Sequence, residues 1–220
     1  MDFKPERELG ADILKVENLT KKGFFENISF TVKEGDKIGF VSENGNTLSM
    51  LFDVITGKEE ADGGTYKWGS TAQFSYMPQN YDDYFDGVDL TLVRWLDRYA
   101  KQHDEEFLRG WLGRMLFSKE EALKKAKVLS GGEKVRCMLA KMMLEQGNVL
   151  ILDEPTNHLD LESITSLNKG LINFKGPVLL VSHDHELVQT VCSRIIDIEG
   201  GEKVYDKDTT YDEYIDAGRA

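Results

Sequence analysis

The chain has 220 residues, of which 40% are hydrophobic, so it can form one large domain or two small ones around a substantial core. Its 27 Lys and Arg residues stand against 39 Asp and Glu residues, and the net charge of −12 argues against broad binding to a nucleic-acid backbone. No apolar run approaches the ~20 residues that span a bilayer, and no secretion signal is recognisable, so we expect a cytoplasmic protein without membrane insertion.

The first third of the sequence predicts short strands. Residues 1–11 are polar, contain Pro5 and show no steady period, so we expect them to be the end of a linker that precedes a domain over residues 12–220. The stretch from Ile28 to Val32 alternates apolar and polar residues, which is typical of a half-buried strand. Further strands are expected from Ile13 and at 37–41, 65–68 and 73–77.

The middle of the sequence predicts helices. Leu92, Trp95, Leu96 and Tyr99 follow helical spacing, and a second amphipathic pattern runs over 107–115. A capping-box pattern, formed by Ser118 and Glu121, predicts a third short helix. We interpret the aromatic residues of these patterns as helix core, not as a cofactor site.

From residue 128 onward, apolar strands alternate with helices. The strands are expected at 149–152, 177–181 and 194–198, each preceded by a helical stretch. This alternation predicts an α/β fold with a parallel sheet that helices cover on both faces.

The stretch LSGGEKVR (129–136) predicts a helix start that can bind an anion. Ser130 can cap the helix and Glu133 completes a capping box, while Gly131 and Gly132 leave backbone N–H groups open at the positive end of the helix. Taken alone, this pattern is equally typical of ordinary capping.

The sequence VLILDEPTNHLD (149–160) supplies carboxylates that indicate a ligand site in addition to that helix start. Its buried strand delivers Asp153 and Glu154 at its carboxyl end, where α/β proteins bind ligands. Asp153 is suited to hold Mg²⁺ through water, and Glu154 to orient or deprotonate an attacking water. His183 follows the next buried strand and can sense a γ-phosphate, and Gln79, after the strand at 73–77, can ligate Mg²⁺.

These stretches, in this order, resemble the ATP-binding-cassette (ABC) superfamily from Asp12 to about Tyr214. The resemblance implies a P-loop nucleotide-binding domain with a RecA-like parallel core, an antiparallel β-subdomain and a helical subdomain at roughly 82–146. It also implies ATP and Mg²⁺ as cofactors and head-to-tail pairing of two cassettes. Each ATP would then lie between the phosphate loop of one cassette and the Ser-Gly-Gly helix of the other.

The phosphate loop departs from the family pattern G-x-x-x-x-G-K-[ST]. In that register Ser42 and Thr47 replace the two glycines and Leu48 replaces the lysine, whereas Ser49 keeps the hydroxyl for Mg²⁺. Losing a charge-assisted phosphate contact costs about 1.5–3 kcal/mol. We therefore expect a weakened nucleotide site, formed by Ser42, Glu43, Asn44, Gly45, Asn46, Thr47, Leu48 and Ser49.

The adenine side of the site departs from the family pattern as well, because the turn LTKKGFF is short where family members usually present an aromatic residue that stacks on adenine. Phe24 or Phe25 can stack on a base, and we expect Phe25 to pack inward. Since the Ser-Gly-Gly face keeps its residues, the chain can still complete a site whose phosphate loop belongs to a partner.

EPTNHLDLESI, LSGGEKVRCMLAKMML and the opening FKPERELGADILKVENLTKK resemble the second cassette of an ABC-F protein. That resemblance implies a tandem ATPase without a transmembrane partner, associated with the ribosome, whose other cassette is the N-terminal half of the same protein. Two alternatives remain: the ATPase subunit of a transporter, and an interaction module that does not hydrolyse ATP.

Overall fold

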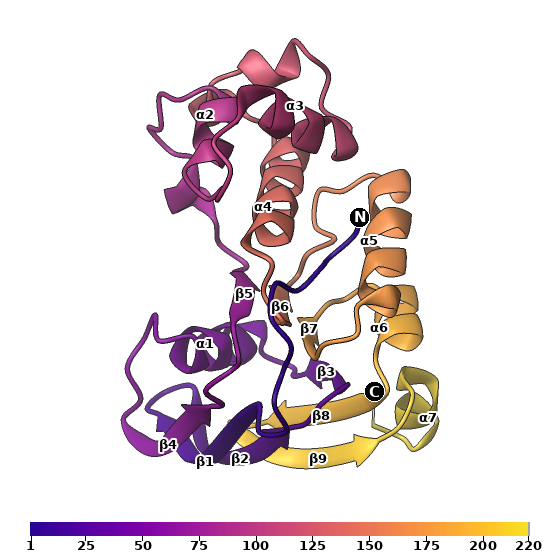
Figure 1. The fold of residues 1–220 in the computed structure, drawn as a ribbon. Helices are drawn as coiled ribbons and strands as arrows, with labels where there is room; N and C mark the ends of the chain where they lie inside the picture. Colours follow the sequence, from indigo (N-terminus) through magenta and orange to yellow (C-terminus); the bar gives the residue numbers. More distant parts are fainter. Residues whose placement is uncertain (220) are drawn as a thin grey trace.

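The computed structural model describes residues 1–219, so the last residue of the predicted domain, 220, lies outside the described part. Figure 1 shows strands in the lower part of the molecule and a group of helices above them. The strands are β1 (Leu14–Lys21), β2 (Phe25–Val32), β3 (Lys37–Val41), β4 (Gly63–Trp68), β5 (Phe74–Met77), β6 (Val149–Asp153), β7 (Val178–Val181), β8 (Arg194–Glu199) and β9 (Glu202–Asp208). The helices are α1 (Gly45–Ile55), α2 (Leu92–Asp97), α3 (Glu105–Arg114), α4 (Gly131–Glu145), α5 (Leu161–Asn173), α6 (His185–Val191) and α7 (Tyr211–Asp216).

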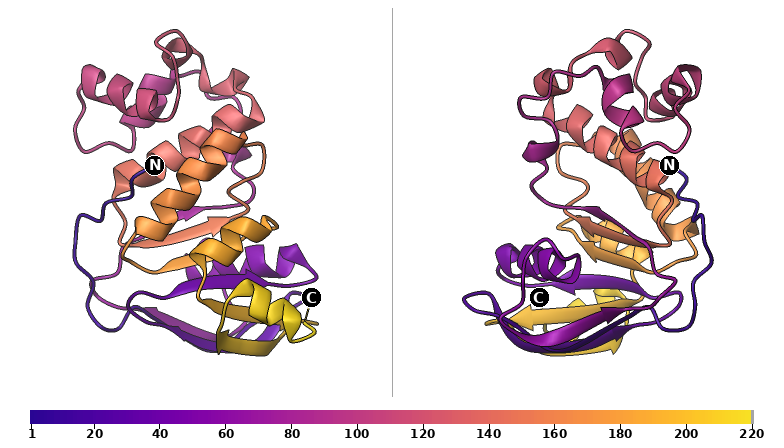
Figure 2. Two further views of the ribbon diagram at one scale, coloured as in Figure 1. Left: turned by 90° about the vertical axis from the view of Figure 1, so that its right-hand side faces the viewer. Right: turned by 60° about the vertical axis from the view of Figure 1, so that its left-hand side comes forward.

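The larger sheet has the strand order β5-β6-β7-β3-β8-β9, in which only β9 is antiparallel to its neighbour. Alternate residues of β6 point to opposite faces, so Val149 and Ile151 belong to the core around α1, and Leu150 and Leu152 to the core that α5 and α6 share. Both faces are therefore covered, as Figure 2 also shows for α5 and α6. The α/β fold class with a parallel core is confirmed.

The smaller sheet has the order β2-β1-β4 and is antiparallel throughout. Its apolar residues, among them Val16, Ile28 and Phe30, share one core with the inner face of α1. The antiparallel β-subdomain is therefore confirmed, and it supports α1 from the side opposite the larger sheet.

The expected helices lie between residues 82 and 145, in the group above the sheet in Figure 1. The stretch that begins at Ser118 differs from the prediction: both capping-box hydrogen bonds to Glu121 form, but they open only the 3-10 turn η2 (Glu121–Leu123). A single turn results because Lys124 already has extended backbone angles. The boundaries 82–146 stay a prediction.

Residues 1–11 contain no helix or strand, but they are packed against the body of the protein. Phe3 is only 6% exposed. The segment approaches α5 so closely that a Cβ atom on Gly170 would lie 2.8 Å from the carbonyl oxygen of Met1. The buried Phe3 ring explains why the start of this segment packs against α5. That residues 1–11 are the end of a linker stays a prediction.

None of the helices in residues 1–219 is both long and apolar enough to cross a membrane.

Candidate nucleotide site

The junction of β3 and α1, where the phosphate loop was expected, is a capped helix start. Asn44 is the N-cap: its side chain accepts a hydrogen bond from the amide of Asn46 (3.1 Å), and its carbonyl accepts one from the amide of Thr47 (3.0 Å). The hydroxyl of Ser42 accepts from the amide of Asn44 (3.2 Å). A phosphate cradle needs these amides to point at the ligand. Here, three of the amides are already hydrogen-bonded within the protein.

The two residues that replace the second glycine and the lysine face the protein interior. Leu48 is 2% exposed and packs in the core that joins α1 to the sheet. Thr47 is 4% exposed, and its hydroxyl donates to the carbonyl of Phe24 at 3.3 Å. Of the predicted loop residues, Glu43, Asn44, Gly45 and Asn46 are exposed. The position of the lysine thus contributes a core side chain and no cation.

A cavity of about 400 Å³ opens beside this helix start and is lined by Phe24, Glu26 and Glu43 among others. Phe24 is half-buried, which leaves its ring as the aromatic surface of the cavity. Phe25 is only 1% exposed, so the expectation that it packs inward is confirmed. Two carboxylates at the cavity oppose a triphosphate by like-charge repulsion.

Three predicted Mg²⁺ ligands come together although they lie far apart in the sequence. The hydroxyl of Ser49 donates to Oδ2 of Asp153 at 2.5 Å and lies 3.1 Å from Oε1 of Gln79. Burial raises the pKa of Asp153 to about 6, so the carboxylate is still mostly ionised at neutral pH. Hydroxyl, amide and carboxylate oxygens are the donors that Mg²⁺ prefers, so this set fits the ion.

Glu154 and His183 also meet. Oε2 of Glu154 accepts from the amide of His183, and Oε1 lies 3.2 Å from its Nε2. Glu154 has a positive φ of 52°, a sparsely populated conformation for a non-glycine residue that is common at functional sites. Burial raises the pKa of its carboxyl group, while the His183 ring is 90% exposed. The pair can therefore exchange a proton with a water at this edge of the sheet.

Ser130 is the N-cap of α4, and the predicted capping box with Glu133 forms in both directions, at 3.3 Å each. Within residues 1–219, the Ser130 hydroxyl accepts a hydrogen bond but donates none, so its proton is available to a ligand. α4 starts within the helical group, whereas α1 lies against the sheet (Figure 1), so the two halves of the predicted site lie on separate parts of the chain.

His158 was not predicted to contact this helix start. A Cβ atom on Gly132 would lie 2.6 Å from the His158 carbonyl oxygen, and one on Gly131 would lie 3.0 Å from its ring. The two glycines thus have a packing role in addition to the expected ligand role. No pattern in the sequence indicates this contact, because it depends on how the 154–160 loop folds back.

Lys134, in the first turns of α4, joins this helix to the segment that follows Gln79. Its Nζ lies 3.5 Å from Oδ1 of Asp82 and 3.4 Å from Oδ1 of Asp86. One side chain therefore links the Ser130 helix to the segment between β5 and α2, which also contains Gln79.

Comparison with known proteins identifies the family to which the chain belongs. A sequence model described as ABC transporter matches residues 25–157. The uncharacterized ABC transporter ATP-binding protein YkpA of Bacillus subtilis is 55% identical over 98% of this chain and 41% of its own length. The energy-dependent translational throttle protein EttA of Escherichia coli K12 is 32% identical over 96% of this chain and 39% of its own length. The chain thus spans about two fifths of the length of these relatives.

Among solved structures, MJ0796, a bacterial ABC transporter cassette in dimeric form, matches with a TM-score of 0.72 and 19% identity over 89% of this chain and 98% of that one. This likeness concerns the fold alone. The family model, which matches more than half of the chain, establishes that the chain belongs to the ATP-binding-cassette (ABC transporter) family.

Proposed function

We propose that this chain is one cassette of an ABC-F type ATPase and pairs head to tail with a second cassette, to which it supplies the Ser130 helix start. In that arrangement, the competent nucleotide site consists of the partner's phosphate loop and Ser130, Gly131 and Gly132 of this chain. The observation that carries the proposal is a contrast within one molecule: the Ser130 face keeps a free hydroxyl donor, whereas Leu48 is buried in the core.

The chain's own site has a smaller role in this proposal. Ser49, Gln79 and Asp153 would hold Mg²⁺, and Glu154 and His183 would act on water, but the capped loop offers little to the phosphates. Any nucleotide held there would bind through Ser42–Ser49 backbone groups and the Phe24 ring. ATP turnover by the isolated chain is therefore expected to be weak.

The link to translation rests on relatedness. EttA is named a translational throttle protein, and it shares 32% of its residues with this chain over the matched region. We extend this to a ribosome-associated role in the cytoplasm, with the second cassette in the same full-length protein. A second candidate, the ATPase subunit of a membrane transporter, is favoured by the name of YkpA. Sedimentation of the full-length protein with ribosomes, against co-purification with a membrane permease, separates these two roles.

Calorimetric titration of ATP–Mg²⁺ into the chain tests the central contrast. We expect no measurable binding by the natural chain and micromolar to millimolar binding after Ser42→Gly, Thr47→Gly and Leu48→Lys are combined. Leu48→Met serves as the control, because it keeps an apolar side chain of similar volume in the core. Tight binding by the natural chain would contradict the proposal and would show that backbone amides and Ser49 suffice.

A further inference from the structure

A hollow of about 780 Å³ lies at the end of the smaller sheet where β1 begins and β2 and β4 end. Three lysines, Lys15, Lys33 and Lys67, line it together with one acidic residue, Asp12, and all four residues are exposed. None of the lining residues belongs to the predicted nucleotide site. Lys15 lies about 20 Å along the strand from Lys21, where β1 turns toward the nucleotide cavity. We call this separate site the lysine hollow.

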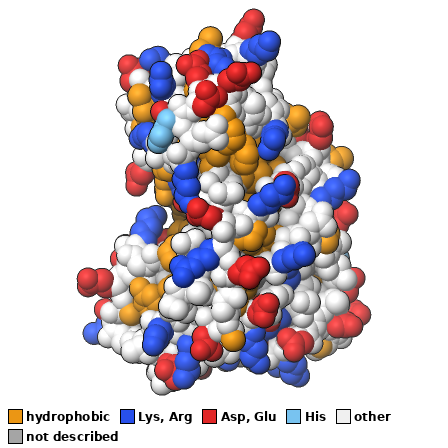
Figure 3. All heavy atoms as spheres, viewed as in Figure 1, with side chains coloured by type: hydrophobic (Ala, Val, Ile, Leu, Met, Phe, Trp, Pro, Cys, Tyr) orange, Lys and Arg blue, Asp and Glu red, His pale blue; other side chains and the backbone are white. Residues whose placement is uncertain are grey.

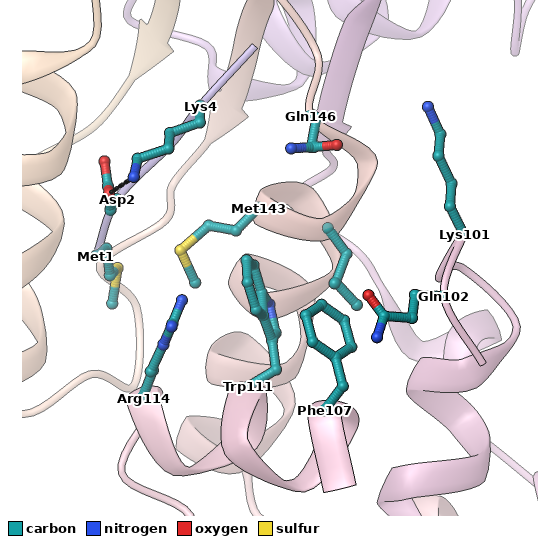
Figure 4. Close-up of a pocket in the computed structure, with 11 residues that line it drawn as sticks. Met1, Asp2, Lys4, Lys101, Gln102, Phe107, Trp111, Arg114, Met143 and Gln146 are labelled. Atoms are coloured by element: carbon teal, nitrogen blue, oxygen red, sulfur yellow. Dashed lines mark ion pairs between the residues drawn. The ribbon is translucent and has the colours of Figure 1, made fainter. Parts of the chain in front are cut away.

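The groove between α3 and α4, which Figure 4 shows, has basic side chains that acidic ones balance. Lys4 pairs with Asp2, and Lys101 pairs with Glu6. Arg114 borders a neighbouring hollow that also contains two carboxylates. Figure 3 shows basic and acidic side chains interspersed in the same way on the face that it draws. That groove therefore has no surplus of positive charge.

The lysine hollow keeps a positive surplus when the ion-pair partner of its lysines is counted. Lys15 pairs with Glu17 at 2.9 Å, but the two side chains are 62% and 54% exposed, so the pair is weak. Lys33 and Lys67 form no ion pair with any residue from 1 to 219, and neither does Asp12. Three lysines against Asp12 and Glu17 leave one excess positive charge, in a chain whose net charge is −12.

Two of these lysines lie directly opposite each other in the sheet. Lys15 of β1 pairs with Lys67 of β4 in the antiparallel register, so their Cβ atoms are about 5 Å apart. Lys33 lies two residues beyond Thr31, the β2 partner of Lys15, which places it on the same outer face at about 7–8 Å. Like charges in directly opposite positions destabilise a sheet. Because an anion between them removes that repulsion, this arrangement favours a bound anion.

Linked phosphate groups fit the lysine hollow better than carboxylates do. No arginine lines the hollow, and arginine is the residue that binds carboxylates bidentately, whereas lysine binds phosphate as a point charge. The row of three lysines spans about 12 Å, which exceeds a single phosphate group. The hydroxyls of Thr31, Ser70 and Thr71 also line the hollow, and within residues 1–219 none of them donates a hydrogen bond. They can therefore bond a ribose 2′-hydroxyl, which both donates and accepts.

We propose that the lysine hollow binds the sugar–phosphate backbone of an RNA strand, with Lys15, Lys33 and Lys67 on neighbouring phosphates. Contacts of this kind position a nucleic acid without reading its sequence. The lysine hollow shares no residue with the nucleotide site, so RNA binding does not require ATP. It would give the proposed ribosome association a contact surface, and titrations with RNA and with ATP can fail independently of each other.

The test is a titration of the full chain into a fluorescein-labelled oligouridylate of about 12 nucleotides, followed by fluorescence anisotropy between about 25 and 150 mM KCl. Each lysine–phosphate contact on a single strand contributes about −0.7 to the slope of log affinity against log salt concentration, so three contacts predict a slope of about −2. Combining Lys33→Gln with Lys67→Gln should reduce the slope to about −0.7 and lower the affinity at the lowest salt by about tenfold or more.

Lys119→Gln combined with Lys169→Gln is the matched control, because it makes the same charge change at exposed residues outside the lysine hollow. It should leave the affinity and the slope unchanged, and thermal unfolding should confirm that each variant is folded. No measurable binding at the lowest salt, or an equal loss in both double variants, would overturn the proposal. So would equally tight binding of an oligodeoxyuridylate or a polyglutamate peptide of the same length, because the site would then not distinguish RNA from other polyanions.

Discussion

The hydroxyl of Ser49 donates a hydrogen bond of 2.5 Å to Oδ2 of Asp153, which joins the start of α1 to the end of β6. The oxygen ligands of the expected metal site therefore converge, while the residues just before Ser49 are capped or buried. In the expected nucleotide site, the metal ligands are thus brought together, whereas the phosphate loop offers few free donors.

Ser130→Asp should block the site that this chain completes for a partner. Asp is as good an N-cap as Ser, so α4 should stay folded, but its negative charge would face the nucleotide phosphates. We expect ATP hydrolysis by the paired assembly to fall by about tenfold or more, measured as phosphate release.

Thr210→Asp is its matched control, since Thr210 caps α7 through the same capping box with Glu213 and lies outside the site. That variant should hydrolyse ATP at the natural rate. An equal loss in both variants, or in neither, would contradict the role given to Ser130.

Glu154→Gln should change turnover in the paired assembly by less than about twofold. Glu154 serves the phosphate loop of its own chain, where Leu48 replaces the lysine, so little flux is expected through that site. The equivalent glutamate of the partner should carry the reaction. A loss of most of the phosphate release in Glu154→Gln would mean that the chain's own site turns over.

Gly132→Ala should destabilise the fold by roughly 1–3 kcal/mol, because its Cβ would lie 2.6 Å from the carbonyl oxygen of His158. Gly110→Ala is the control: a Cβ there meets nothing within 4 Å, and the residue lies inside α3. Alanine is the better helix former, so Gly110→Ala should stabilise the fold by about 0.5–1 kcal/mol. Urea unfolding measures both, and equal stability of the two variants would refute the contact.

Lys37 predicts a pH dependence of stability. Burial lowers its pKa to about 8, so the folded state favours the neutral amine, and the charged form opposes folding below that pH. This penalty disappears as the pH rises from 8 toward the unfolded value of 10.5. Relative to Lys37→Met, the natural chain should therefore gain on the order of 1 kcal/mol in the free energy of unfolding between pH 7.5 and about 9.5, allowing for its partial exposure.

The control for this effect is Lys15→Met, since the Lys15 side chain is 62% exposed. That variant should follow the pH dependence of the natural chain. If Lys37→Met did so as well, the buried amine would not be the cause.

Buried and strongly patterned elements were predictable from the sequence. The strand at 37–41 has the predicted bounds, and the strand predicted at 149–152 extends by one residue to Asp153. Strand β9 and helix α7 were not predicted, because β9 is a polar edge strand and α7 has only 6 residues. The Thr210–Glu213 capping box was the available signal for α7.

The candidate site also contains contacts that the sequence could predict and contacts that it could not. Spacing was sufficient to predict that Ser49, Gln79 and Asp153 meet, since Asp153 ends β6, Gln79 follows β5 and Ser49 lies in the helix after β3. It was not sufficient to place the Leu48 side chain or to predict the contact of His158 with Gly132. Both depend on which packing alternative is lowest in free energy, and no local pattern carries that information.

The bridge from Lys134 to Asp82 and Asp86 sets an upper limit on communication between the two nucleotide sites of a pair. These carboxylates are 57% and 67% exposed, and ion pairs of that kind contribute at most about 1 kcal/mol each. Two such pairs give a coupling free energy of at most about 2 kcal/mol, which changes affinity by about thirtyfold, equally in both directions. Through this bridge alone, occupancy of one site can bias the other but cannot switch it on or off.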